Sequence, residues 1–429
     1  MLKNFRLRIC QIFLIVLVLV TASTAALAET VAIKPPGAGT AQDPMRIENL
    51  AHLRWLSEDA TAADLGKVYK LMNNIDASET ETWTHDFARI GFLPIGGTSS
   101  VPAQFTGYFN GNNKTISNLY INVSATRVGF IRHIGIGEGV QNLTLENLRI
   151  AGRNTMGAVA GINEGNIVNV SVDVHMTITT DNGADFGGLV GFNRGLIARS
   201  HAHITMEAVT GQELNPRKVG GLVGRNGRPG IEPEIRDSYA TGRIQGSDEV
   251  GGLVGDMFSG IIVSSFAAVE VSGSSGAPPS ALGGFFGYQH TGVVVTGSYW
   301  SPEISGRPSS GSLDAQASVQ SRTKAQMLGS AAITSMSDLN FNNVWQTTLS
   351  SANRCTIGLP ELRVLAYRPS PFVESTLSGG TGTTDDPCLI EHWNDLHKAR
   401  DHLSAAFALN ANLDNQTAGY ADRVTNPSG

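Results

Sequence analysis

The sequence predicts an all-β protein that folds as a parallel β-helix, a solenoid in which each coil of the chain adds strands to long sheets. Three observations favour this fold. Glycine accounts for 49 of the 429 residues and charged residues for only 16%, a composition typical of turn-rich β proteins. A glycine-bounded apolar pentapeptide also recurs at a spacing near 30 residues. Units of that length cannot bury a face alone and gain a core by stacking.

Composition also excludes several classes of protein. The hydrophobic fraction of 41% argues against a disordered chain. The formal net charge is −6, and no basic stripe with interleaved aromatic residues is present. Proteins that bind nucleic acids carry such a stripe. We therefore expect no nucleic-acid partner.

The first 28 residues have the parts of a secretory signal peptide. Lys3, Arg6 and Arg8 precede an apolar run over residues 12–20, and the segment ends in Ala26-Leu27-Ala28. The run is shorter than the ~20 apolar residues that a transmembrane helix needs, and the final triplet fits a cleavage site. We expect cleavage after Ala28, a secreted or cell-surface location, and no transmembrane anchor in the mature chain.

Export bears on the cysteines. Removal of residues 1–28 leaves Cys355 and Cys388. Thiols in an oxidising compartment tend to pair. A disulfide between the two is expected, and the alternative of two unpaired or buried thiols stays open at this point.

Residues 29–104 are expected to form an N-terminal cap and the first strands. Leu50, Leu53 and Leu56, together with Trp55, lie at roughly helical spacing. A short helix across the first coil would cover a sheet edge that otherwise invites strand pairing. The expected strand that follows ends at Asp76.

Residues 105–300 hold the repeats. A degenerate copy of the pentapeptide starts at Gly129, and the first glycines of successive copies are 28 to 33 residues apart. The five clear copies begin and end with the glycine pairs Gly157 and Gly161, Gly187 and Gly191, Gly220 and Gly224, Gly251 and Gly255, and Gly283 and Gly287. We expect these glycines where the chain turns at positive φ or where another backbone approaches closely.

A second short element follows each opening glycine after 13 to 18 residues. Its members share a serine, at Ser171, Ser200, Ser238, Ser265 and Ser298. Each copy thus offers two or three short strands. Propeller blades need about 40–50 residues, and leucine-rich repeats need a leucine pattern that is absent here. A stacked parallel β-helix fits both the length and the glycines.

These copies, with Ser238-Tyr239-Ala240-Thr241-Gly242 as the clearest second element, resemble the GLUG motif family of bacterial exported and surface proteins. Residues 109–119 resemble the segment that opens such arrays. Tyr299-Trp300, residues 322–327 and residues 359–362 resemble the segment that closes them, over residues 301–370. The resemblance implies a right-handed parallel β-helix, as in adhesins, large surface proteins and the non-catalytic parts of IgA-specific metallopeptidases. It implies no catalysis by the repeats.

Residues 371–429 look like the start of a second, incomplete cap-like unit. Residues 382–390 echo residues 39–47, and Trp393 and Leu396 follow at roughly helical spacing before a strand that ends at Asp414. No repeats follow this second start. A truncated piece of a larger surface protein is therefore an open alternative.

Candidates for chemistry are few. None of the ten histidines forms the His-Glu-x-x-His motif of a metalloprotease. The pairs His397/His402 and His201/His203 are only weak metal candidates. Several acidic residues fall mostly near turns and are expected to be solvated: Glu207, Glu213, Asp237, Asp248, Glu249 and Asp256. We expect no catalytic residue, no cofactor and no metal site.

One aligned column is a possible binding surface. It comprises Val172, His201, Tyr239, Phe266 and Tyr299. One register step per coil would stack three aromatic rings and an imidazole. The column lies either inside a packed wall or on the outside, where it would offer a flat platform for a sugar or a partner's apolar patch.

The sequence therefore predicts an exported, non-catalytic, adhesin-like β-helix protein for attachment or scaffolding, with a glycan or a protein on another surface as its partner. The alternative is a β-helix lyase or hydrolase that acts on polysaccharide. Such an enzyme needs a groove in which successive coils gather acids and an Arg or Lys.

Overall fold

The computed structural model describes residues 29–85, 88–89, 91–97, 103–179, 184–208, 214–274, 281–311, 319–347, 356–363, 373–377, 384, 387–391, 393–399, 406–414 and 416–417. The predicted signal peptide and Cys355 lie outside the described residues. Within the described residues, no helix is both long enough and apolar enough to cross a bilayer.

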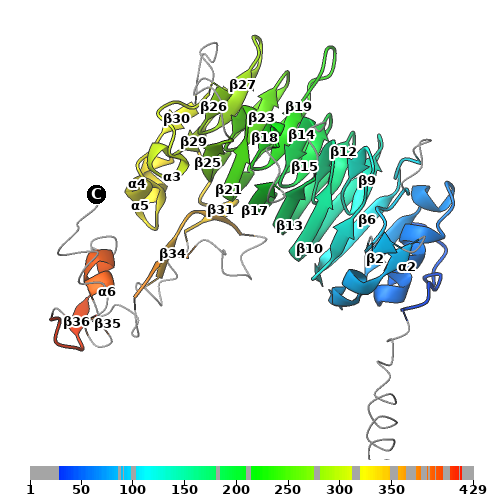
Figure 1. The fold of residues 1–429 in the computed structure, drawn as a ribbon, viewed down its shortest axis with the longest axis horizontal. Helices are drawn as coiled ribbons and strands as arrows, with labels where there is room; N and C mark the ends of the chain where they lie inside the picture. The colour runs from blue at the N-terminus through cyan, green and yellow to red at the C-terminus, as the bar shows by residue number, and fades with distance from the viewer. Residues whose placement is uncertain are drawn as a thin grey trace, which may run out of the picture.

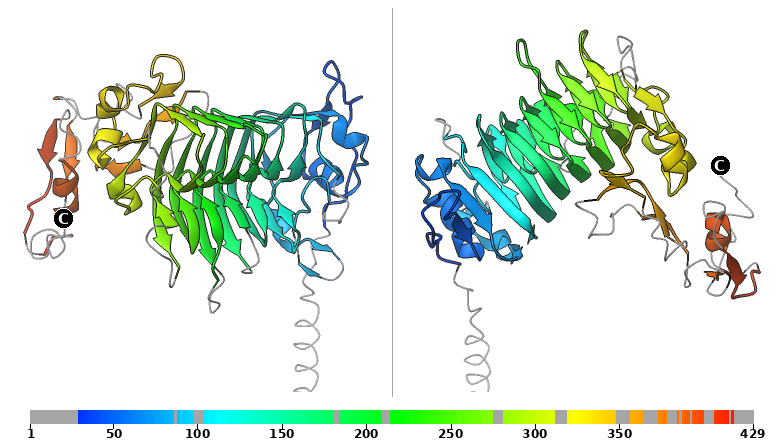
Figure 2. Two further views of the ribbon diagram at one scale, coloured as in Figure 1. Left: turned by 90° about the horizontal axis from the view of Figure 1, so that it is seen from above. Right: turned by 180° about the vertical axis from the view of Figure 1, so that it is seen from behind.

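The predicted fold class is confirmed, because the body of the molecule is a parallel β-solenoid of six turns (Figure 1). Each turn adds a strand to a first narrow sheet, then to a second narrow sheet, then to a broad sheet, and each ladder along the solenoid is parallel. Figure 2 shows the stacked strands from above and from behind. The backbone of each turn thus finds hydrogen-bond partners in the turns before and after it.

The strands of each sheet recur once per turn. The first narrow sheet comprises β8 (Arg127–Val128), β11 (Thr155–Gly157), β14 (Ala184–Gly187), β18 (Arg217–Gly220), β22 (Asp248–Gly251) and β26 (Leu282–Gly283). The second narrow sheet comprises β9 (Ile131–Ile134), β12 (Ala160–Asn163), β15 (Val190–Asn193), β19 (Val223–Asn226), β23 (Val254–Met257) and β27 (Phe286–Gln289).

The broad sheet changes character along the solenoid. In the first two turns it contains the long strands β10 (Gly139–Gly152) and β13 (Asn166–Ile178). Later turns split the long strand into a short and a longer piece: β16 (Leu196–Ala198) and β17 (His201–Ala208), β20 (Glu234–Arg236) and β21 (Tyr239–Gly246), β24 (Ile261–Val263) and β25 (Phe266–Gly273), and β28 (Val294–Thr296) and β29 (Ser298–Trp300).

The repeat glycines form the corner between the two narrow sheets. All ten have negative or extended φ, so close approach rather than positive φ explains them. A Cβ on Gly187 would lie 2.6 Å from the Gly224 nitrogen in the next turn. Real Cβ atoms do not come that close to backbone, so only glycine fits this corner.

Two polar ladders run through the buried interior of the solenoid. Asn163 donates from Nδ2 to Oδ1 of Asn193, and Asn193 does the same to Asn226, both at 2.8 Å. All three side chains are fully buried. Serines form the second ladder, in which the Ser200 amide donates to Ser238 Oγ at 3.2 Å and the Ser238 amide donates to Ser265 Oγ at 3.2 Å. These bonds satisfy buried polar groups and fix the register of the turns.

The serine series has one member out of register. Ser171 pairs with His201 and not with Ser200. Val170 takes the ladder position instead, and its amide donates to Ser200 Oγ at 3.1 Å. Ser265 and Ser298 continue the ladder, with a bond of 3.3 Å from the Ser265 amide to Ser298 Oγ.

The N-terminal cap contains the helix that the sequence predicts, α2 (Leu50–Glu58), whose N-cap residue Asn49 accepts a hydrogen bond from the His52 amide. The other cap elements are β1 (Met45–Ile47), η1 (Asp64–Gly66), β2 (Val68–Leu71), β3 (Ile75–Asp76), η2 (Ser78–Thr82), β4 (Thr84–His85) and β5 (Ala88–Arg89). β2 and β3 pair with β6 (Tyr108–Ser117), and β7 (Tyr120–Asn122) pairs with β10. The strands lead the cap into the broad sheet.

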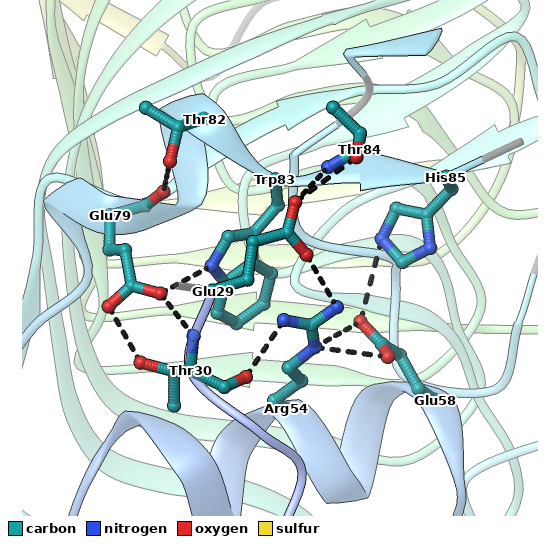
Figure 3. A network of polar contacts seen from close by, with 9 residues as sticks. All are labelled: Glu29, Thr30, Arg54, Glu58, Glu79, Thr82, Trp83, Thr84 and His85. Carbon is teal, nitrogen blue, oxygen red and sulfur yellow. Dashed lines mark hydrogen bonds and ion pairs between the residues drawn. The ribbon is translucent and has the colours of Figure 1, made fainter. Parts of the chain in front are cut away.

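A polar network fastens the first described residues to the cap (Figure 3). Arg54 donates to Glu58 at 3.0 Å, to Glu29 at 3.0 Å and to the Thr30 carbonyl at 2.8 Å. Thr30 donates from its amide and its hydroxyl to Glu79, at 2.5 and 2.6 Å. Residues 29 and 30 are therefore a structural part of the cap.

The last turn is followed by a segment with short helices. Its elements are α3 (Pro302–Ser305), β30 (Val319–Ser321), α4 (Lys324–Met327), α5 (Ala331–Ser335), β31 (Trp345–Gln346), β32 (Thr356–Gly358), β33 (Glu361–Leu362) and β34 (Val373–Thr376). We call the part from α4 to β33 the closing segment.

A second strand–helix–strand unit follows the closing segment. It comprises β35 (Cys388–Ile390), α6 (Trp393–Lys398) and β36 (Phe407–Leu409), and the two strands pair in parallel. Cys388 is buried and disulfide-bonded. Since Cys355 lies outside the described residues, its pairing with Cys388 stays a prediction.

Candidate functional site

The predicted aromatic column exists on the broad sheet. His201, Tyr239, Phe266 and Tyr299 pair in register along β17, β21, β25 and β29. The His201 and Tyr239 rings are stacked with centroids 4.6 Å apart, and Tyr239 and Phe266 at 4.7 Å. Offset or parallel ring pairs of this kind contribute about 0.5–1.5 kcal/mol beyond area burial.

The fifth proposed member of the column, Val172, is wrong. Val172 pairs with Ala202, and Ser171 occupies the column instead. A shift of one residue moves a strand side chain to the opposite face of the sheet. Val172 therefore belongs to the core inside the solenoid.

The column faces away from the solenoid interior. Ala202, Ala240 and Ala267 alternate with the rings and belong to the core of the solenoid. Tyr239, Phe266 and Tyr299 belong to a second apolar cluster, which they share with the closing segment. The outer face of this part of the broad sheet is therefore apolar and covered.

The closing segment supplies the cover, and β31 lies along the outer face beside β17 and β21 (Figure 1). The Trp345 ring is 5.7 Å from the Tyr239 ring and 5.5 Å from the Phe266 ring. Tyr299 donates from its hydroxyl to Asp338 at 2.7 Å. Because Phe266 and Tyr299 are fully buried, the rings offer no open platform in this structure.

His201 ends the column as a buried imidazole. Its Nε2 lies 3.2 Å from the Ser171 hydroxyl. Burial lowers the pKa of His201 to about 3, and neighbouring His203 lowers it further. His201 is therefore neutral near pH 7 and serves the column as a flat ring.

A pocket of about 350 Å³ opens beside the covered column on the same outer face. Its residues come from three strands of the broad sheet and from α3 and α4. They are His203, Thr205, Gly242, Arg243, Glu270, Glu303, Ile304 and Lys324. The volume is at the lower end of the range for small-molecule sites.

The pocket combines both charges with a titratable imidazole. Thr205, Arg243 and Glu270 form one column across successive turns, and Arg243 donates to Glu207 at 3.0 Å. Glu303 accepts the Lys324 backbone amide at 2.7 Å. Such a set of donors and acceptors can hydrogen-bond a polyhydroxylated or carboxylate-bearing ligand.

His203 forms one wall of the pocket. Its Nδ1 lies 3.0 Å from the Thr241 hydroxyl. Burial lowers the pKa of His203, Asp173 opposes that effect, and Arg243 reinforces it. A neutral imidazole can donate one hydrogen bond and accept another, as sugar hydroxyls require.

The prediction that the acidic residues near turns are solvated is wrong for Asp256. Its side chain is 2% exposed and forms an ion pair with Lys218 at 2.6 Å. His290 and Arg225 also contact it, at 3.2 and 3.5 Å. The cause is the corner between the narrow sheets, where neighbouring turns bring these side chains together. Glu213 lies outside the described residues.

Asp185 belongs to the same charged corner. Burial raises its pKa to about 6, with the charges of Asp256 and Glu249 adding to the effect and those of Arg225 and Lys218 opposing it. Within the described residues, no group of three or more His, Cys, Asp or Glu side chains could hold a metal ion.

The sequence reasoning missed the pocket and the asparagine ladder. The ladder had a signal, because Asn163, Asn193 and Asn226 each lie six residues after an opening glycine. The pocket residues Arg243 and Glu270 become neighbours only once the register of the turns is known. Glu303 and Lys324 come from helices outside the repeat, and no period marks them.

No protein-family model matches the chain. It is similar to "Halomucin" of Haloquadratum walsbyi, with 40% identity over 157 residues, which are 36% of this chain and 2% of that protein. It is also similar to the "Putative Gly-rich membrane protein" of Evansella cellulosilytica, with 33% identity over 144 residues, which are 32% of this chain and 15% of that protein. The chain thus matches only a small part of either relative.

Among solved structures, the chain resembles a "putative immunoglobulin A1 protease" from Bacteroides ovatus. The TM-score is 0.50 at 17% sequence identity, and the alignment covers 76% of this chain and 94% of the other. At that identity the likeness bears on the fold alone, which is the β-solenoid described above.

Proposed function

We propose that this protein is an exported, surface-associated β-helix module of the GLUG type that attaches to a glycan through the pocket on the outer face of the broad sheet. The mixed-charge lining of that pocket is the observation that carries the proposal. The matching segments of halomucin and of the Gly-rich membrane protein support a place at the cell surface.

The lining favours a polar ligand held by several directed bonds. Arg243 and Lys324 offer donors, Glu270 and Glu303 offer acceptors, and Ile304 gives an apolar patch against which a sugar ring can pack. A few convergent polar groups around a concave site are typical of small-ligand recognition. The pocket's position beside the rigid sheet keeps these groups in place without a ligand.

A glycan-binding array, followed by titration of each hit, tests this proposal. We expect Arg243→Gln to weaken binding by about tenfold or more, because a hydrogen bond to a charged group contributes about 1.5–3 kcal/mol. Arg236→Gln is the matched control, since Arg236 is equally exposed on the same sheet but is not a pocket residue. An array without hits, or equal loss in both variants, would contradict the proposal.

Catalysis on polysaccharide is the second candidate function, favoured by the same pocket. Glu270 and Glu303 come from different elements, and a basic side chain, Arg243, lies on the turn next to Glu270. Two carboxyl groups across a sugar-sized space can act as acid and base. Sugar release from a panel of polysaccharides, abolished by Glu270→Gln, would favour this enzyme over the attachment module.

A further inference from the structure

The two strand–helix–strand units at the start and near the end of the chain have the same register. In the first unit, β1 pairs with β2 so that Met45 lies opposite Tyr69 and Ile47 opposite Leu71. In the second unit, β35 pairs with β36 so that Cys388 lies opposite Phe407 and Ile390 opposite Leu409. Each pair of parallel strands is joined through a helix, α2 or α6. The second unit is therefore structurally equivalent to the first.

The first unit continues into the solenoid through the other edge of β2. There β6 adds in parallel, with Tyr69 opposite Phe109 and Lys70 opposite Asn110. Among the described residues, β36 has a strand partner on its β35 side only. The equivalent edge of the second unit is thus open where the first has β6.

Equivalent side chains differ sharply in burial. Leu53, Tyr69 and Leu71 of the first unit are each 0% exposed. Their counterparts in the second unit are Leu396, Phe407 and Leu409, which are 44%, 37% and 64% exposed. The second unit therefore presents apolar side chains that the first unit buries against the strands and core that follow it.

The backbone of β36 also faces the open edge. The Asn410 amide donates to the Ile390 carbonyl and the Cys388 amide donates to the Ala406 carbonyl. In a parallel ladder the bonding direction alternates, so the backbone groups of Phe407 and Leu409 point away from β35. An open strand edge with apolar neighbours is a template for another strand.

We propose that β36 and α6 form an acceptor for one extended strand of another polypeptide, added in parallel and carrying an aromatic residue where β6 carries Phe109. The β2–β6 pair of this same chain defines the chemistry of the occupant, because it shows what covers the equivalent edge. The surface would let the protein join end to end with a β-helix segment. It is independent of the pocket on the broad sheet.

A labelled peptide of residues 106–118, which contains the β6 strand, is the probe for fluorescence anisotropy with the exported protein. We expect saturable binding, and a loss of about tenfold or more in the Leu409→Lys variant. Leu409→Pro should have the same effect, because proline removes the amide hydrogen that faces the open edge. A peptide with Phe109→Asp should bind at least about tenfold more weakly.

Ile136→Lys is the control variant, since Ile136 is 81% exposed and lies in the solenoid. It should bind the peptide like the unchanged protein. Circular dichroism and the melting temperature establish that each variant is folded. No saturable binding by the folded protein, or equal loss in the control variant, would overturn the proposal. Sedimentation that shows a Leu409-dependent dimer which the peptide does not dissociate would assign the edge to a second copy instead.

Discussion

The N-terminal cap and the closing segment protect the solenoid by different physical means. The cap residues Leu53, Leu56 and Trp83 belong to the one core that runs through the turns, and a charged network centred on Arg54 fastens the chain to it. The closing segment lies on the outer face and forms a core of its own, around Trp345. The cap thus ends the stack, whereas the closing segment covers a side wall.

The difference teaches how a β-helix can carry aromatic residues on its outside. A stacked column of rings is rigid and apolar, and uncovered it would invite association. The chain covers the rings of β21 and β25 with Trp345 and leaves the neighbouring polar residues around Arg243 accessible in the pocket. The apolar cover and the polar pocket are therefore parts of one outer face.

The largest expected effect comes from removal of the cover. Trp345→Ala should lower the free energy of unfolding of the region around the closing segment by about 3–5 kcal/mol, the usual cost of truncating a buried aromatic residue. Urea unfolding and hydrogen exchange along β21 and β25 measure the effect. The exchange should rise there and stay unchanged in the N-terminal cap.

Ile333→Ala is the control for this prediction, because Ile333 lies in the same segment but is 49% exposed. Its effect should stay within about 0.5 kcal/mol, as for most surface substitutions. If Trp345→Ala is as mild as this control, the closing segment does not stabilise the column and the comparison between the two ends fails.

A smaller effect is expected at the other end. The Arg54 side chain is 12% exposed, and its guanidinium lies 4.4 Å from the centre of the Trp83 ring. Arg54→Ala would leave Glu29 and Glu58 without their partner. Since the pairs are only partly buried, we expect a loss of about 2 kcal/mol, between the values for exposed and buried pairs.

Salt dependence separates the two mechanisms. The effect of Arg54→Ala, measured by urea unfolding, should shrink in 1 M salt, where charges are screened within about 3 Å. The effect of Trp345→Ala should not shrink. Arg46→Ala is the matched control, because its pair with Asp43 is exposed and should contribute less than about 1 kcal/mol. Equal salt responses at the two ends would contradict the distinction.

The sequence predicts the solenoid well because close packing at each corner leaves a period. Only glycine fits where Gly187 meets the next turn, so glycines recur every 30 residues or so. The helix of the cap was predicted from its apolar spacing for the same kind of reason. Buried features that repeat once per turn, such as the asparagine ladder, are in principle readable from one sequence.

Features that depend on tertiary placement were not predictable in this way. The burial of Tyr239 and Phe266 depends on where Trp345 lies, about 80–100 residues further along a segment without repeats. The error at Val172 has another cause. Successive serines were used as markers, and one of them, Ser171, is shifted by one residue relative to the ladder.

The pH response should also differ between the two ends. Burial opposes ionisation of Glu29, but hydrogen bonds from Thr84 and Arg54 outweigh it, so its pKa lies below its usual value. Glu79 behaves alike, with Thr30 and Trp83 as donors. Carboxyl groups with a lowered pKa stabilise the folded state above about pH 4.3 and lose that contribution only as the pH falls further.

The smallest expected effect lies at His201, in a different pH window. The folded protein holds its pKa near 3, whereas in the unfolded chain the imidazole takes up a proton below about pH 6.5. The unfolded state therefore binds more protons between these values, and the folded state loses stability as the pH falls from about 6.5 towards 3. Between pH 7.5 and 5.5 this loss is about 1 kcal/mol for one group.

Urea unfolding of the unchanged protein and of His201→Phe at both pH values measures this contribution, because the difference between the two proteins cancels the other titrating groups. Phenylalanine keeps a ring stacked on Tyr239 and cannot take up a proton. The variant should lose about 1 kcal/mol less than the unchanged protein between pH 7.5 and 5.5. Equal losses would mean that His201 is hydrated when the protein is folded, and the column would then be open to solvent at its first ring.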